Sequence, residues 1–247
     1  MNVMESFSLK DKVAMVTGGA GLYGRQIVEA LAEADADVYV ASRGIEKLEE
    51  LAKEHRDKGH RVSALKMDQG DERSVLAARD ELLRGAGRLD VLVNNSVARP
   101  MKKGWTDDAA VFDQSMHVNA TGLFVVTRAF GQIMEKQRCG SIINIGSMMG
   151  MVGVEDANYD GTTMHGWNPD YYFHKGGMIN FTRFCASYFG RFGVRVNCLS
   201  PGGLFNDAGV CVIGDTIYIA GGEGPAGSHF SHFLVGNIIR ANDSGNR

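Results

Sequence analysis

The sequence has few of the features that mark linkers, membrane spans or targeting segments. It contains only 4 prolines in 247 residues and no low-complexity segment, so nothing marks a boundary between domains. No apolar run approaches the length of a membrane span, and the N-terminus lacks a basic region followed by an apolar core. We therefore expect a single cytoplasmic domain over residues 1–247, with no membrane partner.

Cysteine and basic charge are also scarce. The 4 cysteines show no close pairing and fall mostly in apolar surroundings, which favours reduced structural thiols over disulfides. His229 and His232 are close in sequence, but two histidines without further ligands do not indicate a metal site, and none is expected. With 26 basic against 29 acidic residues, the net charge of −3 provides no basic surface for nucleic acid.

What the sequence does contain is an alternation of short apolar runs and amphipathic stretches. Strands are expected at residues 13–16, 37–41, 61–67, 89–93, 141–145 and 194–199, and helices at residues 25–33, 45–57, 72–84, 106–135 and 171–189. Apolar strands that alternate with helices predict an α/β fold, a Rossmann-type doubly wound parallel sheet with helices on both faces. In such sheets ligands bind outside the carboxyl ends of the strands.

The first expected strand leads into a glycine-dense turn, Thr17-Gly-Gly-Ala-Gly-Leu-Tyr-Gly24, and then into a helix. A diphosphate needs backbone N–H donors that no side chain obstructs, together with the positive end of a helix dipole. The turn meets both needs, so it is predicted to bind the diphosphate of a dinucleotide. The residues predicted to do so are Gly18, Gly21, Leu22, Tyr23 and Gly24. A tight strand-to-helix turn without a ligand is the alternative.

The ends of the next two strands carry candidate contacts for the adenosine part of the cofactor. Ser42 and Arg43 stand where a carboxylate would otherwise accept hydrogen bonds from the ribose of NAD. A serine and a guanidinium can hold a 2′-phosphate, which favours NADP, with NAD as the other option; a solvated charge at a helix start is an equal interpretation of Arg43. Asp68 is able to accept from the adenine amino group, or to cap the following helix together with Gln69 and Gly70.

Four further residues carry candidate chemistry. Tyr171 and Lys175 are four residues apart and so share one helix face, where the ammonium favours the phenolate. Such a tyrosine can exchange a proton with a carbonyl or alcohol oxygen near neutral pH. Ser147, just past the fifth strand, is placed to hydrogen-bond the same oxygen. Asn119 lies in an otherwise apolar helical stretch, where we expect it to be buried, with a water leading to Lys175 as its partner.

Together these residues resemble the classical short-chain dehydrogenase/reductase family over about residues 8 to 205. The matching motifs are the Thr17-Gly18 turn, Asp68, Leu92-Val-Asn-Asn95, Asn119, Ser147, Tyr171 with Lys175, and Asn197-Cys-Leu-Ser-Pro-Gly202. The resemblance implies hydride transfer between a nicotinamide and a carbonyl/alcohol pair, in a homodimer or homotetramer.

The resemblance also implies roles for individual residues. Tyr171 would be the general acid/base, Ser147 would orient the substrate oxygen, and Asn119 would hold a water of the proton relay. Lys175 would bind the nicotinamide ribose, next to Tyr171. Further cofactor contacts are implied for Asn95, Ser96, Pro201 and Gly202.

Three departures from the family pattern stand out. In the glycine turn the middle glycine is Gly21, and Leu22 takes the place where the classical pattern has glycine. Asn95 is followed by Ser96 and Val97 instead of Ala-Gly, so side chains enter a spot that is usually kept small. The segment between Ser147 and Tyr171 is longer than the classical spacing and rich in carboxylates, amides and aromatics. This insertion suits hydroxyl-rich substrates such as sugars, sugar acids or polyols, unless it is an ordinary polar surface loop.

The C-terminal region is a further departure from the family pattern. The family normally has a substrate lid, a helix and a last strand after its Pro-Gly, whereas here Thr216-Ile-Tyr-Ile-Ala-Gly-Gly222 follows closely and is expected to be a surrogate last strand. The stretch from Phe230 to Ile239 is amphipathic and is a candidate substitute helix. We therefore expect residues 203–247 to be atypical and to leave a sheet edge exposed. A catalytically inactive dinucleotide-binding scaffold is thus the alternative to an active oxidoreductase, although the intact Tyr171–Lys175 pair favours the enzyme.

Overall fold

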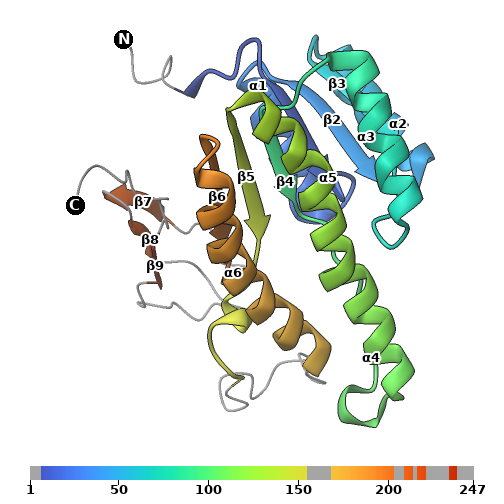
Figure 1. Ribbon diagram of the computed structural model, residues 1–247, viewed down its shortest axis with the longest axis vertical. Coiled ribbons are helices and arrows are strands. Elements are labelled where there is room, and N and C mark those ends of the chain that lie inside the picture. Colours follow the sequence, from blue (N-terminus) through green and yellow to red (C-terminus); the bar gives the residue numbers. More distant parts are fainter. Residues whose placement is uncertain (1–6, 155–167, 203–208, 214–215, 221–233, 238–247) are drawn as a thin grey trace.

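Six strands of the computed structural model form one parallel sheet, in the order β3-β2-β1-β4-β5-β6 (Figure 1). The structure describes residues 7–154 and 168–202, and the backbone of strands at residues 209–213, 216–220 and 234–237. Every neighbouring pair in this sheet is parallel. The predicted Rossmann-type doubly wound sheet is confirmed.

The elements alternate along the chain as expected. The strands are β1 Val13–Thr17, β2 Asp37–Ser42, β3 Arg61–Lys66, β4 Val91–Asn94, β5 Gly140–Ile145 and β6 Val194–Leu199. The helices are α1 Leu22–Glu33, α2 Ile45–Asp57, α3 Glu72–Ala86, α4 Ala109–Met116, α5 Gly122–Gln137 and α6 Pro169–Gly190. Short 3-10 segments, η2 Gly104–Thr106 and η4 Met148–Gly150, precede α4 and follow β5, and the π-helical segment η3 His117–Thr121 joins α4 to α5. None of the described helices is long and apolar enough to cross a membrane.

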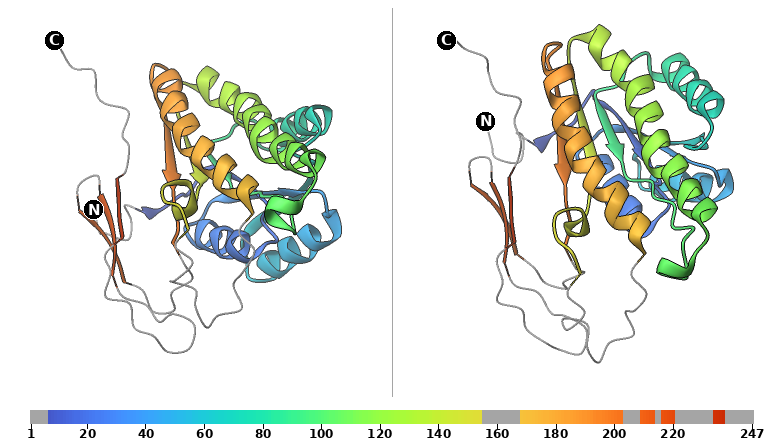
Figure 2. Two further views of the ribbon diagram at one scale, coloured as in Figure 1. Left: turned by 90° about the horizontal axis from the view of Figure 1, so that it is seen from below. Right: turned by 60° about the horizontal axis from the view of Figure 1, so that its bottom comes forward.

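The core lies in two layers, one on each face of the sheet (Figure 2). Successive residues of a strand point to opposite faces, so Ala14 and Val16 of β1 pack toward α1 and α2, whereas Val13 and Met15 pack toward α3, α5 and α6. All five residues of β1 are buried. This two-sided burial explains why β1 is apolar from Val13 to Val16 and does not alternate with polar residues.

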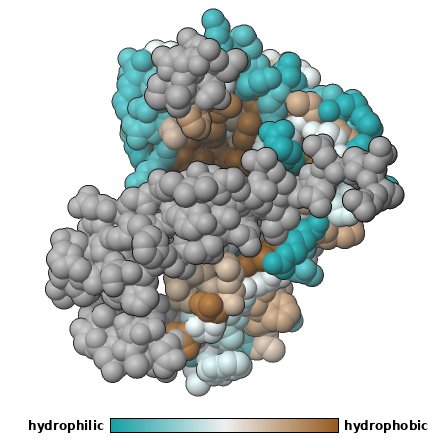
Figure 3. Space-filling view, turned by 90° about the vertical axis from the view of Figure 1, so that its left-hand side faces the viewer, coloured by the Kyte–Doolittle hydropathy of each residue, from teal (hydrophilic) through white to brown (hydrophobic). Residues whose placement is uncertain are grey.

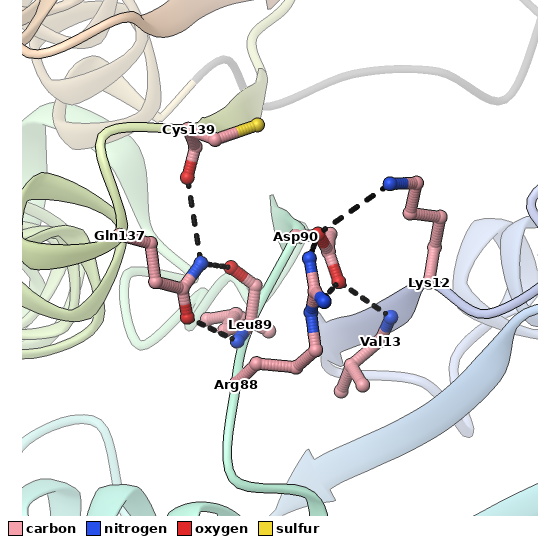
Figure 4. Close-up of polar contacts among 7 residues, drawn as sticks. All are labelled: Lys12, Val13, Arg88, Leu89, Asp90, Gln137 and Cys139. Atoms are coloured by element: carbon pink, nitrogen blue, oxygen red, sulfur yellow. Dashed lines mark hydrogen bonds and ion pairs between the residues drawn. The ribbon is translucent and has the colours of Figure 1, made fainter.

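A polar cluster fixes the amino ends of β1 and β4 (Figure 4). Asp90 is buried, accepts a hydrogen bond from the Val13 backbone N–H at 2.9 Å, and pairs with the Arg88 guanidinium at 2.6 and 2.9 Å. At the end of α5, Gln137 exchanges two hydrogen bonds with the Leu89 backbone, at 3.0 and 2.8 Å. Ligands of such sheets bind at the carboxyl ends of the strands, and these contacts lie at the opposite, amino ends. We therefore assign them a role in stabilising the fold and not in binding a ligand.

The C-terminal region corrects two predictions. Strands β7 Gly209–Ile213, β8 Thr216–Ala220 and β9 Leu234–Asn237 form a separate antiparallel sheet. β8 is the expected surrogate last strand, but it pairs with β7 and β9 and not with the parallel sheet. Leu234–Asn237 is a strand inside the stretch interpreted as a helix, so that interpretation is wrong; the rest of that stretch lies outside the described residues. Only two residues separate β7 from β8, which is too few for the crossover that a parallel pair requires, so the two strands pair antiparallel.

Strand β6 is one of the two edge strands of the parallel sheet, opposite β3, within the part of the chain that the structure describes. Figure 3 looks onto this side of the molecule and shows apolar surface there. Leu199, the last residue of β6, is among the exposed large apolar residues. No described strand pairs with the outer side of β6, and an edge left exposed by the region after Gly202 stays a prediction.

Candidate active site

The glycine turn holds the first turn of α1 open to solvent. Gly18 has a φ of +68°, and its N–H donates to the Ala41 carbonyl at 2.7 Å. A Cβ atom on Gly24 would overlap the Gly18 carbonyl oxygen, so only glycine lets α1 approach the turn this closely. No side chain caps the N-terminus of α1, and Leu22 is 86% exposed. The uncapped N–H groups suit an anion such as a diphosphate.

The end of β4 braces this turn. The Thr17 hydroxyl accepts from the backbone N–H groups of Asn95 and Ser96, each at 3.0 Å. The Asn95 amide donates to the carbonyls of Thr17 and Gly18 at 3.1 and 3.2 Å. Ser96 lies directly against the glycine turn, in the place that the family pattern usually keeps small. A Cβ atom on Gly18 would lie only 3.1 Å from the Ser96 Cα atom. Asn95 and Ser96 therefore hold the glycine turn in place through hydrogen bonds with Thr17 and Gly18.

Two residues stand at the carboxyl end of β2 as predicted. Ser42 is the last residue of the strand and is half-buried, and Arg43 is exposed. Arg43 makes no hydrogen bond or ion pair with another described residue, so its guanidinium is available either to a 2′-phosphate or to solvent.

The loop after β3 differs from the expectation. The Asp68 carboxylate accepts from the Gly70 N–H at 2.9 Å, whereas the N-cap of α3 is Asp71, which accepts from the Arg73 N–H at 2.9 Å. The interpretation of Asp68 as a helix cap is therefore wrong, since its side chain shapes the preceding turn. Gln69 is buried, and its amide donates to the Val118 carbonyl at 2.9 Å, so its side chain is directed toward η3.

Ser147 and α6 are brought together by a close contact of η4 with the helix. Ser147 is buried just after β5, and its hydroxyl accepts from the Met149 N–H at 3.2 Å. A Cβ on Gly150 would lie 2.6 Å from the Lys175 backbone, so η4 lies directly against α6 only because residue 150 is glycine. The segment that carries Ser147 is thereby fixed beside the turn of α6 that carries Tyr171 and Lys175.

Pro201 and Gly202 join the same region. They follow β6, and the Pro201 carbonyl accepts from the Met148 N–H at 2.9 Å. This hydrogen bond ties the chain after β6 to the residue that follows Ser147. The two residues predicted to border the nicotinamide thus lie next to the predicted catalytic serine.

Lys175 is buried beneath Tyr171. Its side chain is 3% exposed, its ammonium donates to the Ile145 carbonyl at the end of β5, and its Nζ lies 5.7 Å from the centroid of the Tyr171 ring. The pKa of Lys175 is lowered to about 8, chiefly by burial; the Cys198 side chain opposes this shift and the Arg99 guanidinium adds to it. The predicted Tyr171–Lys175 juxtaposition is present.

Asn119 is buried as predicted, but protein groups satisfy its side chain. Its carbonyl oxygen accepts from the Ala98 N–H at 2.8 Å, and its amide donates to the Ala98 carbonyl at 2.8 Å and to the Ser115 hydroxyl at 3.0 Å. Both amide donors of Asn119 are thus used within the protein, and a water that leads to Lys175 stays a prediction that only the carbonyl oxygen of the side chain can meet. The Ser115 hydroxyl in turn donates to the buried Asp170 carboxylate. This chain of hydrogen bonds links the loop after β4 to the first turn of α6.

Sequence reasoning missed several residues of this region. Asp170 and Ser115 were not singled out, although Ser115 lies one helical turn before Asn119 and Asp170 immediately precedes Tyr171. His174 is buried and meets the Tyr171 ring edge-on at 5.3 Å between centroids. Burial, followed by the charges of Lys175 and Arg99, lowers the pKa of His174 to about 3.

Arg99 was missed as well. Its Cζ lies 4.6 Å from the centroid of the Tyr171 ring. A charged side chain shortly after the end of β4 could have been noticed in the sequence, because the carboxyl ends of the strands form the site. Of the insertion before Tyr171, residues 155–167 lie outside the described residues. Among the residues that the structure does describe, no three or more potential metal ligands form a cluster.

Comparison with known proteins agrees with this geometry. The model of the short chain dehydrogenase family matches residues 12–208. A 3-oxoacyl-[acyl-carrier-protein] reductase of Aquifex aeolicus is 32% identical over 201 residues, which are 81% of this chain and 76% of that protein. For the curated relatives compared, the matched part ranges from 64% to 76% of their length.

Two solved structures have the same fold. An NAD+-bound xylitol dehydrogenase is 28% identical, with a TM-score of 0.71 over 78% of this chain and 71% of that chain. A gluconate 5-dehydrogenase from Burkholderia cenocepacia, in complex with NADP and tartrate, is 28% identical, with a TM-score of 0.71 over 81% of this chain and 74% of that chain. With the family match, the sheet order and the Ser147, Tyr171 and Lys175 arrangement in agreement, this chain belongs to the short-chain dehydrogenase/reductase family of oxidoreductases.

Proposed function

We propose that the protein is an NAD(P)-dependent oxidoreductase that interconverts a carbonyl and a secondary alcohol on a small polar or sugar-like substrate. The observation that carries this proposal is the placement of Lys175 one helical turn from Tyr171, buried and anchored to β5, with the Ser147 segment packed against the same turn of α6. A phenol, an ammonium and a hydroxyl so placed can manage the proton of an alcohol/carbonyl pair.

In this proposal each residue has one task. The nicotinamide, when bound, gives or accepts the hydride. Tyr171 donates a proton to the carbonyl oxygen in reduction and removes it in oxidation, and Ser147 hydrogen-bonds the same oxygen. Lys175 holds the nicotinamide ribose and places positive charge beside the phenol. Asn119 uses both amide N–H donors within the protein, so it can meet a relay water only as an acceptor.

The residues present fit a dinucleotide. The uncapped first turn of α1 offers backbone N–H groups at Leu22 and Tyr23, and the turn beneath it is braced by Asn95. Ser42 and Arg43 support NADP, because Arg43 has no partner among the described residues and a phosphate would supply one. NAD is the other option, since the two similar structures carry NAD+ in one case and NADP in the other.

The substrate class rests on weaker support. A xylitol dehydrogenase and a gluconate 5-dehydrogenase, which take a polyol and a sugar acid, are among the proteins of similar structure. The polar composition of the insertion before Tyr171 agrees with a hydroxyl-rich substrate. A non-catalytic dinucleotide-binding scaffold is the second candidate, favoured by the separate β7–β9 sheet where the family is expected to continue its parallel sheet.

The test is a screen of NADPH and NADH oxidation across small carbonyl compounds. Tyr171→Phe should lower kcat by about 100-fold or more while leaving NADPH affinity nearly unchanged, because only the transferable proton is lost. Tyr172→Phe is the matched control and should retain turnover. A wild-type protein that binds NADPH but reduces no carbonyl would favour the scaffold, and loss of turnover in Tyr172→Phe alone would contradict the role of Tyr171.

A further inference from the structure

Arg99 places a positive charge over the ring of Tyr171. Its Cζ lies 4.6 Å from the ring centroid, and the Lys175 Nζ lies 5.7 Å from the same centroid. The backbone just before Arg99 is held in place, because Asn119 exchanges two hydrogen bonds of 2.8 Å with Ala98. The fold therefore fixes the segment that brings this guanidinium to the predicted catalytic phenol.

The positive charge at this place has no counterion among the described residues. Every ion pair that the described side chains form lies elsewhere, and none includes Arg99 or Lys175. The buried Asp170 carboxylate accepts from Ser115 and also forms no ion pair. Two cations thus lie close to the Tyr171 ring. The positive charge of each disfavours the charged form of the other, unless an anion lies near both.

We propose that Arg99 binds an anionic group of the substrate, a carboxylate or a phosphate, that lies close to the carbon that exchanges the hydride. A guanidinium pairs bidentately with the oxygens of either group, and Arg99 is exposed, so a ligand can reach it. Because the anion-binding guanidinium and the phenol are adjacent, one small molecule can contact both. The inference deepens the proposed function, since it assumes that the substrate reacts at Tyr171.

Binding is measured first, so that the result does not depend on turnover. Tartrate is titrated into the full-length protein saturated with NADPH, with threitol, in which hydroxymethyl groups replace both carboxylates, as the neutral counterpart. Glycerol 3-phosphate and glycerol form the phosphate arm. The wild type should bind at least one anion more tightly than its neutral counterpart, and Arg99→Met should weaken that binding by about 10- to 100-fold. The affinity for the anion, and not for the neutral compound, should fall with added salt.

The variants separate charge from shape. Arg99→Met keeps an unbranched stem that can cover the Tyr171 ring, and Arg99→Lys keeps the charge but loses the bidentate fork, so its affinity should be intermediate. Arg183→Met removes another exposed arginine, on α6, and should bind as the wild type does. For turnover, the ratio of kcat/KM for a small oxo acid to that for its methyl ester should fall about 10-fold or more in Arg99→Met.

The outcomes distinguish this inference from the function it rests on. Anions that bind no more tightly than their neutral counterparts, or that bind Arg99→Met as tightly as wild type, would overturn the anion site. Equal losses for the oxo acid and its ester would mean that Arg99 acts on the phenol, which also overturns it. A protein that binds tartrate or glycerol 3-phosphate through Arg99 yet reduces no carbonyl would support the anion site and overturn the proposed function.

Discussion

Burial of a neutral histidine beside Tyr171 predicts that the protein loses stability in mild acid. His174 is 4% exposed, neither ring nitrogen is hydrogen-bonded within the described residues, and its pKa is lowered to about 3, first by burial and then by the charges of Lys175 and Arg99. In the unfolded chain an ordinary histidine takes up a proton below a pH of about 6.5. The folded-state pKa lies lower, so the unfolded state binds more protons in this range. Stability is therefore retained above about pH 6.5 and falls as the pH falls toward 3.

The size of the stability loss depends on how far the pH lies below the ordinary histidine pKa of about 6.5. One pKa unit corresponds to about 1.4 kcal/mol, so between about pH 7.5 and about pH 5.5 the free energy of unfolding should fall by about 1.4 kcal/mol through His174 alone. This value holds as long as the folded-state pKa of His174 stays well below 5.5, as the value of about 3 implies.

Urea unfolding followed by circular dichroism at the two pH values measures this loss. His174→Leu cannot take up the proton and should lack this share of the pH dependence. His117→Leu, at an exposed position in η3, should keep it. Burial also lowers the pKa of His55, but that residue is common to all three proteins and its contribution cancels. The same pH dependence in wild type and His174→Leu would refute the reasoning.

Three further predictions follow from other contacts. Arg43→Ala should weaken NADPH binding by about 10-fold and spare NADH, because only NADPH carries the phosphate; equal losses in a fluorescence titration would contradict it. Ser115→Ala should lower the free energy of unfolding by about 1–3 kcal/mol and lower kcat, since it leaves the Asp170 carboxylate buried without its donor; unfolding and turnover assays that match the wild type would exclude this role. We also propose self-association through the outer face of α6, where Phe173 and Phe184 are 67% and 65% exposed, so Phe184→Glu should yield a smaller species in size-exclusion chromatography, and an unchanged elution volume would count against it.

The sequence was sufficient to predict the elements whose signals are local. The apolar run of β1 is continuous because both faces of the sheet are covered there, and the glycine turn could be interpreted because its steric demands are local. Tyr171 and Lys175 were paired correctly because helical spacing alone places them on one face. The alternative interpretation of Asp68 as a helix cap was wrong, because Asp68 and Asp71 lie in one short loop and Asp71 is the cap. The choice between them depends on the backbone, which is extended at Asp71 and directs its side chain to the Arg73 N–H.

The contacts that were missed join residues far apart in sequence. Ser115 and Asp170 are 55 positions apart, and nothing in the local pattern of either residue indicates the other. Asn119 was expected to need a partner, but the nearby Ala98 backbone supplies it only because the loop after β4 folds back onto η3. The antiparallel pairing of β8 with β7 escaped prediction for a different reason. The family pattern suggested a parallel place for β8, whereas its neighbour in sequence offered a closer partner.

The buried hydrogen bonds explain how an exposed site keeps its geometry. Ala98, Asn119, Ser115 and Asp170 form one continuous chain of buried or half-buried partners. A buried polar group is costly unless it is paired, so breaking any one of these hydrogen bonds leaves an unsatisfied group behind. The loop that presents Arg99 and the helix turn that presents Tyr171 are thus held in one arrangement from beneath. Arg99 is exposed and Tyr171 is half-buried, so the substrate is expected to meet both side chains there.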